Sequence, residues 1–161
     1  MPENVEELSL SPQARAGLEK AGWHQGYRCD LVPYHEAWKS DGYTPPETVL
    51  GFLSRFGGLH FRSSPLEGLP VQEDFHLDAR LATQGAYPDQ VADGAELVGS
   101  ALTPIGEAQN RHLVLLMAED GRVFALGDRG VYSVATSGPD LIEFFTAGGR
   151  SLKKLDGSWQ P

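Results

Sequence analysis

The stretch from Ala101 to Ala135 constrains the fold most, because apolar runs alternate there with turn signals. The apolar runs cover residues 101–106, 111–118, 122–126 and 131–135. Glu119-Asp120-Gly121 has the composition of a hairpin turn, and Asp128-Arg129-Gly130 that of another turn. Short runs joined by tight turns pair with their chain neighbours in opposite directions. The sequence therefore predicts an antiparallel meander of strands.

The segment Thr44-Pro45-Pro46-Glu47 has the form of a helix capping box. In that motif the threonine hydroxyl binds the amide of Glu47, while the glutamate carboxylate reaches back to the amide of Thr44. Apolar residues follow at three- and four-residue spacing until Gly57-Gly58: Val49, Leu50, Leu53 and Phe56. We therefore predict a helix that starts at Thr44, with Thr44→Ala removing about 1 kcal/mol of stability.

Further helices and short strands are expected on either side of this segment and of the meander. Ser11 followed by Pro12 is typical of an N-cap, so a helix is predicted over Pro12–Ala21. The remaining helices are expected over 34–40, 80–82, 88–98 and from Ser137 to Gly148-Gly149, with Gly85 and Gly94 as interruptions. Strands are expected over 59–61 and 75–78. Helices packed on one face of a mainly antiparallel sheet form an α+β fold.

The domain organisation is expected to be simple. Residues 1–10 are acidic and poor in apolar side chains, which indicates a flexible N-terminal lead-in before a single domain over 11–161. Cys29 is the only cysteine, and the chain starts without an export signal. The longest strongly apolar stretch, around Leu113–Ala118, is far shorter than the roughly 20 residues of a membrane helix. We therefore expect a cytoplasmic protein that does not enter the membrane.

The residue types that most often carry chemistry are scattered along the chain. The five histidines form no i,i+4 pair and have no cysteine at zinc-ligand spacing, and no GxxxxGKS/T or GxGxxG loop is present. Cys29 has no base at a fixed spacing, although His24 or His35 would be the candidates. We therefore expect no catalytic residue, no metal site and no cofactor. Cys29→Ser is expected to leave thermal unfolding and partner binding unchanged.

The charge balance restricts the kind of partner. The chain has 22 acidic and 13 basic residues, which gives a formal net charge of −9. Phosphate contacts need clustered lysine and arginine, so nucleic acid is not expected to bind directly. A partner with a basic surface would be attracted. The alternative is that the acidity serves only solubility.

Five short motifs resemble, in the same order, the SUKH superfamily of immunity proteins, specifically its third family. They are LEKAGW at Leu18–Trp23, FLSRFGGL at Phe52–Leu59, FHLD at Phe75–Asp78, PIGE at Pro104–Glu107 and LLMAEDGRVFAL at Leu115–Leu126. That family usually has arginine directly after the glycine that follows the tryptophan motif. In this chain Gly26 is followed by Tyr27, and the arginine comes at Arg28.

The resemblance implies an α+β domain that binds a cognate toxin of a polymorphic toxin system inside the producing cell and neutralises it. The toxins of such systems include nucleases and nucleic-acid deaminases. A regulatory or scaffold module of the same superfamily, binding a cellular protein, is the alternative. A hydrolase that uses Cys29 or a scattered carboxylate is a third hypothesis. The oligomeric state is left open by the sequence.

Acidic residues are concentrated between Ser63 and Asn110, where Arg80 is the only base. A toxin that acts on nucleic acid needs a basic groove, which an acidic surface can occupy. The partner-binding residues predicted on this ground are Glu73, Asp74, Asp78, Asp89, Asp93, Glu96 and Glu107. The alternative is a solvated segment whose charge only aids solubility.

Overall fold

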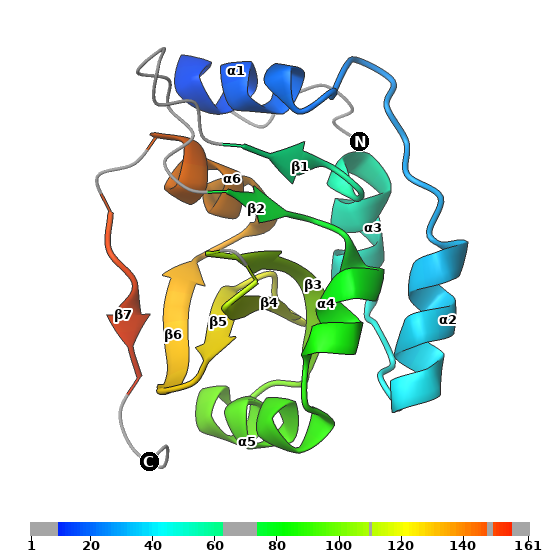
Figure 1. Ribbon diagram of the computed structural model, residues 1–161, viewed down its shortest axis with the longest axis vertical. Helices are drawn as coiled ribbons and strands as arrows, with labels where there is room; N and C mark the ends of the chain where they lie inside the picture. The colour runs from blue at the N-terminus through cyan, green and yellow to red at the C-terminus, as the bar shows by residue number, and fades with distance from the viewer. Residues whose placement is uncertain (1–9, 63–73, 110, 148–149, 156–161) are drawn as a thin grey trace.

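A seven-stranded antiparallel sheet lies at the centre of the computed structural model, which describes residues 10–62, 74–109, 111–147 and 150–155 (Figure 1). The strands are β1 (His60–Phe61), β2 (Phe75–His76), β3 (Leu102–Ala108), β4 (Leu113–Ala118), β5 (Val123–Gly127), β6 (Gly130–Ala135) and β7 (Lys153–Lys154). They are hydrogen-bonded in chain order, so every strand neighbours the strands before and after it in the sequence. The predicted meander is confirmed as β3 to β6.

Six helices accompany the sheet in the described ranges. They are α1 (Pro12–Lys20), α2 (Val32–Asp41), α3 (Glu47–Phe56), α4 (Ala79–Gly85), α5 (Pro88–Val98) and α6 (Gly138–Ala147). The α+β class is confirmed by this arrangement. No helix in the described part of the chain is both long and apolar enough to cross a membrane. The predicted end of the last helix at Gly148-Gly149 lies outside the described residues.

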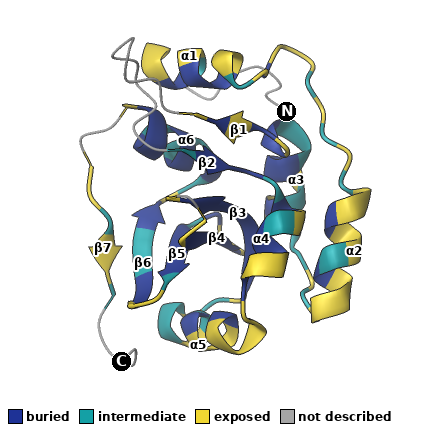
Figure 2. Ribbon diagram, in the orientation of Figure 1, coloured by how far each residue is buried: buried dark blue, intermediate teal, exposed yellow. Residues whose placement is uncertain are grey.

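Both faces of the sheet are covered, whereas we expected helices on one face. On β4, Leu115 belongs to a core shared with α1, α2, α3 and α6, while its neighbour Leu116 belongs to a second core with Val91 of α5. Successive strand residues point to opposite faces. Because every residue of β4 is apolar, a helical layer on one face alone would leave three of its side chains in water. Figure 2 shows the resulting buried centre of the sheet.

Helix α5 is fixed closely to the second face of the sheet. Its glycine at position 94 was expected to interrupt the helix, but the helix runs through it. A Cβ atom at Gly94 would lie 3.3 Å from Val131 Cγ2 and 3.6 Å from Leu102 Cδ1. The missing side chain therefore lets the helix backbone approach β3 and β6, and the opposite side of α5 is exposed (Figure 2).

The capping box predicted at Thr44 is not formed. Helix α3 begins at Glu47, its N-cap residue is Pro46 with φ −78° and ψ 168°, and no side chain caps it. A residue before proline is driven out of the helical region, and both Thr44 and Pro45 precede a proline. A helix that began at Thr44 would require Pro45 to be helical, so the two prolines delay the start of the helix.

This geometry removes the reason to expect that Thr44→Ala destabilises the protein. Since Thr44 is exposed and lies outside the helix, its replacement should change the free energy of unfolding by less than about 0.5 kcal/mol. A urea unfolding curve measures this change. A loss near 1 kcal/mol would instead support the capping box in solution.

Helix α1 has the N-cap that its sequence predicts, and the N-cap residue makes a further hydrogen bond to α6. The hydroxyl of Ser11 accepts the amide of Ala14 at 3.1 Å, so Ser11 is the N-cap of α1. The same hydroxyl donates to Glu143 Oε1 at 2.7 Å, which ties α1 to α6. Leu10 belongs to the predicted flexible lead-in, but it is only 6% exposed and packs in the core. Residues 1–9 lie outside the described ranges.

Candidate functional site

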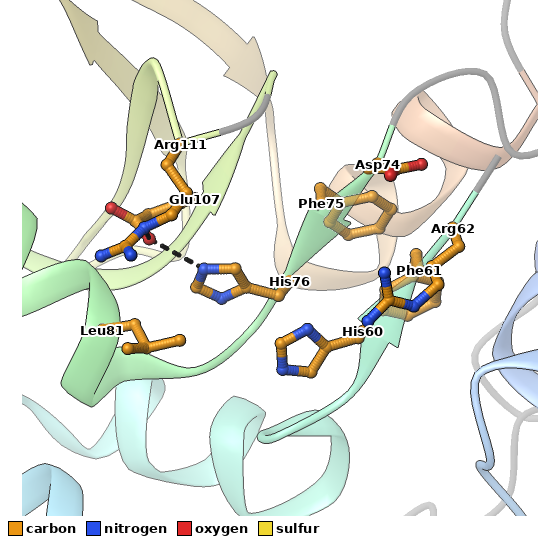
Figure 3. A pocket seen from close by; sticks show the side chains of 9 residues that line it. All are labelled: His60, Phe61, Arg62, Asp74, Phe75, His76, Leu81, Glu107 and Arg111. Carbon is orange, nitrogen blue, oxygen red and sulfur yellow. Dashed lines mark hydrogen bonds and ion pairs between the residues drawn. The ribbon is translucent and has the colours of Figure 1, made fainter.

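Three titratable side chains form a row across the edge of the sheet: His60 on β1, His76 on β2 and Glu107 on β3 (Figure 3). The strand register pairs His60 with His76, and His76 with Glu107. Directly paired residues in antiparallel strands project to the same face, which places the three side chains side by side. The two imidazole ring centroids are 5.2 Å apart. The row depends on register, so the scattered histidines of the sequence did not indicate it.

Two hydrogen bonds define the protonation of the His76 ring. Its Nδ1 atom accepts the backbone N–H of Asp78 at 3.0 Å, so that nitrogen carries no proton. Its Nε2 atom lies 2.9 Å from Oε1 of Glu107. We therefore assign the neutral tautomer with the proton on Nε2, which is donated to the carboxylate.

The carboxylate of Glu107 is enclosed between four elements of the structure. The side chain is 2% exposed, and its Oε1 atom also accepts Arg111 Nε at 2.7 Å. Arg111 follows β3 with a left-handed backbone, φ 71°, a conformation that non-glycine residues seldom adopt. A Cβ atom at Gly85 would lie 2.5 Å from Oε2 of Glu107, so α4 covers the other oxygen. Glu107 therefore links β2, β3, the turn after β3 and the end of α4.

The row borders a hollow of about 210 Å³ (Figure 3). Its lining combines acidic, basic, imidazole and apolar side chains: His60, Phe61, Arg62, Asp74, Phe75, His76, Leu81, Glu107 and Arg111. Two carboxylates face two guanidinium groups here, so the hollow has no excess charge with which to select an ionic ligand. Its buried carboxylate is already held by His76 and Arg111. The row acts as a structural cross-link between strands.

His60 gives the edge of the sheet a pH dependence. Burial lowers its pKa below the ordinary value near 6.5, with smaller contributions from His76 and Arg62 and an opposing one from Asp78. The unfolded chain then binds more protons than the folded chain between the two pKa values. The contribution of His60 to stability is therefore complete above about pH 6.5 and is lost as the pH falls through the lowered pKa.

His60→Gln should accordingly make stability less sensitive to acid. We expect the drop in the urea midpoint between about pH 7.5 and about pH 5.5 to be smaller in this variant than in the wild type. His112→Gln, at an exposed position after the turn, is the matched control. An identical drop in wild type and His60→Gln would contradict the assignment.

Near β2, the acids that we predicted to bind a partner do not form one common surface. Asp74 lines the hollow and is partly exposed, and Asp78 caps α4 by accepting the amides of Arg80 and Leu81. Glu107 cannot form part of a contact surface, because its carboxylate is buried in the cross-link. This corrects the prediction for Glu107. Glu73 lies outside the described residues.

The other three predicted acids come together on α5. Asp89, Asp93 and Glu96 are all exposed. Their spacing of four and then three residues places them on the same side of a helix. No lysine, arginine or histidine occurs in α5. Tyr87, the N-cap residue of this helix, is 67% exposed.

Cys29 has the properties of a poor nucleophile. Burial raises the pKa of its thiol, and Asp30 and Asp78 add to this, against an opposing hydrogen bond with Tyr34. A raised pKa keeps the sulfur protonated at neutral pH, and the thiolate is the reactive form. We therefore still predict that Cys29→Ser leaves thermal unfolding and partner binding unchanged.

The Tyr27-Arg28 pair, where the sequence departs from the usual pattern, joins a loop to the end of α3. The hydroxyl of Tyr27 donates to the carbonyl oxygen of Gly57 at 2.6 Å. Arg28 is exposed, and its Nη1 atom donates to the carbonyl oxygen of Tyr27 at 2.8 Å. Tyr27 therefore has a structural role, and the arginine projects at the surface.

Fold and site together define an α+β domain that displays an acidic helix on one side of an antiparallel sheet, a form suited to binding another protein. The sequence model of the SUKH-3 immunity proteins matches residues 10–147, and the chain belongs to this family. Searches of curated proteins and of solved structures gave no significant match. Membership assigns the protein a non-enzymatic role, the neutralisation of a toxin.

Proposed function

We propose that this immunity protein neutralises a toxin that acts on nucleic acid, a nuclease or a deaminase, inside the producing cell. The acidic side of α5 would occupy the basic groove in which such a toxin holds phosphates. The observation that carries the proposal is the exposure of Asp89, Asp93 and Glu96 along one side of a helix without a basic residue. Inhibition would be steric, because the groove is filled and no bond is made or broken.

Charge and rigidity both favour α5 as the contact element. The exposed carboxylates of α5 would raise the rate of encounter with a basic surface and would exclude partners of like charge. Val91 and Gly94 fix the opposite side of the helix to the sheet, so little order has to be gained on binding. Asp74 and Asp78, both partly exposed, belong to the same proposal as secondary contacts.

Tyr87 is the proposed apolar anchor of this contact. An exposed aromatic ring next to charged residues is a common centre of binding energy in interfaces, because it buries a large area with few rotatable bonds. Tyr87 is the N-cap residue of α5, two positions before Asp89 in the chain, and its ring is 67% exposed.

The test uses the cognate toxin of this protein. Its association rate with the immunity protein is measured between about 50 and about 500 mM salt, and its nucleic-acid substrate is added as competitor. We expect the rate to fall by about tenfold or more with salt and the substrate to compete for binding. A rate independent of salt, or binding that the substrate does not affect, would overturn the proposal.

A further inference from the structure

The start of α4 is bonded to β2 through the side chain of His76 (Figure 3). Nδ1 of this ring accepts the backbone N–H of Asp78 at 3.0 Å, and Asp78 is the N-cap residue of α4. The carboxylate of Asp78 in turn accepts the amides of Arg80 at 3.0 Å and Leu81 at 3.2 Å. Asp78 therefore connects the first turn of the helix to the imidazole ring.

The bond between the ring and α4 requires a neutral imidazole. An imidazolium has a proton on both nitrogens and accepts no hydrogen bond. Protonation of Nδ1 would place two N–H groups against each other at 3.0 Å, so the bond from Asp78 is lost. The bond to Glu107 is kept, because Nε2–H already donates to its carboxylate at 2.9 Å and becomes charge-assisted. Protonation of His76 therefore acts on α4 and spares the pair that joins β2 to β3.

The backbone on the strand side of this contact is held in place. Leu77 is fully buried, and its N–H and C=O form hydrogen bonds of 3.0 and 2.9 Å with residues 58–59. Strand β3 approaches so closely at Gly106 that a Cβ atom there would overlap the carbonyl group of His76. Helix α4 has only seven residues, and so short a helix depends on its tertiary contacts. The side that moves when the bond is lost is therefore Asp78 and the first turn of α4.

Charged and titratable groups surround the His76 ring on several elements. Glu107 is bonded directly to the ring, so a counter-charge for the imidazolium is already in place. The ring centroid of His60 is 5.2 Å away, and His60 is the neighbour that also changes charge near neutral pH. The groups that face the ring in the described ranges are His60 and Arg62 of β1, Asp74 before β2, Glu107 of β3, Arg111 after β3 and Asp78 at the start of α4.

We infer that His76 is a pH-sensitive switch between the sheet and α4: the neutral ring holds the start of the helix, and the imidazolium releases it while the β2–β3 pair stays bonded. Helix α4 packs against α2 and β3. Its release therefore loosens the layer between α2 and the sheet without separating the strands. The inference concerns the order of α4 alone and does not depend on the function assigned to α5.

An NMR titration of the intact wild type between about pH 8 and about pH 5 tests the switch. The ring nitrogens of His76 and the Asp78 amide should shift with one common midpoint. The Ala82 amide, which donates to the Asp78 carbonyl at 3.1 Å, reports the first turn of α4. Its hydrogen-exchange protection factor should fall about three- to tenfold as His76 protonates, and those of β3 and β4 should stay constant. A ring that stays neutral throughout, or one that protonates without a fall at Ala82, would overturn the inference.

Two variants assign the response to His76. His60→Gln removes the neighbouring titratable ring and should keep the fall in protection at Ala82, whereas its loss would assign the response to His60 and overturn the inference. His76→Asn supplies an acceptor oxygen that does not take up a proton near neutral pH, so protection at Ala82 should no longer depend on pH. A fall that persists in His76→Asn would contradict the inference as well. The wild-type titration needs no variant, so the inference is tested even if His76→Asn does not fold.

Discussion

Glu107→Ala should lower the free energy of unfolding by about 3 kcal/mol, since it removes the acceptor in a buried hydrogen-bonded pair. His76 is 7% exposed, and without the carboxylate its Nε2–H has no acceptor in the observed arrangement. The lost side chain also leaves a void beside Gly85. For a chain of this length the loss corresponds to a fall in melting temperature of roughly 6–12 °C.

Two further variants identify the source of this loss. Glu107→Gln keeps the shape and an oxygen that accepts from His76, so its cost should be smaller, about 1 kcal/mol. Glu96→Ala removes an exposed carboxylate of α5 and should change stability by less than about 0.5 kcal/mol. Both are measured by thermal and urea unfolding. If Glu107→Ala unfolds like Glu96→Ala, the carboxylate is not part of a buried cross-link.

A double-mutant cycle distinguishes the two partners of Glu107. Arg111 is 54% exposed, and its pairing with the carboxylate is therefore screened by water. The coupling between Glu107 and Arg111 should stay below about 1 kcal/mol. The coupling between Glu107 and His76 should be larger, because both side chains are buried.

Local sequence signals predicted most of the fold. The turn Glu119-Asp120-Gly121 and its flanking apolar runs define a hairpin within a dozen residues, so β4 and β5 follow from short-range patterns. Thr44 is the instructive exception, since two prolines overrode a capping motif. The strand β7, far from the meander's signals, was not predicted.

The candidate site was less accessible to sequence reasoning. The acidity of its segment predicts a surface position for Glu107, although this residue stands in the otherwise uncharged run of β3, LTPIGEA. A single charge within a strand buried on both faces was the available signal for a paired, buried group. Its partner His76 is 31 residues away and is brought close only by the β2–β3 register. Register is a tertiary property, so the sequence alone does not reveal the pair.

Replacing Asp89, Asp93 and Glu96 together with lysine changes the net charge from −9 by six units, to −3. The fold should tolerate this, because all three side chains are exposed. Lysine at position 89 is unfavourable near the helix N-terminus by a few tenths of a kcal/mol, and lysine at position 96 is favourable near the C-terminus by a similar amount.

The control is a variant with the same change of net charge at other exposed helix positions, Glu19, Glu36 and Asp41 to lysine, on α1 and α2. If α5 lies in the toxin's basic groove, the first variant should associate with the toxin roughly 10- to 100-fold more slowly at low salt, and the control less than about threefold. The rate of the α5 variant should also lose its steep dependence on salt. An equal slowing of both variants would show that only net charge matters, as a merely solubilising segment requires. Unchanged rates and salt slopes in the α5 variant would remove this helix from the interface.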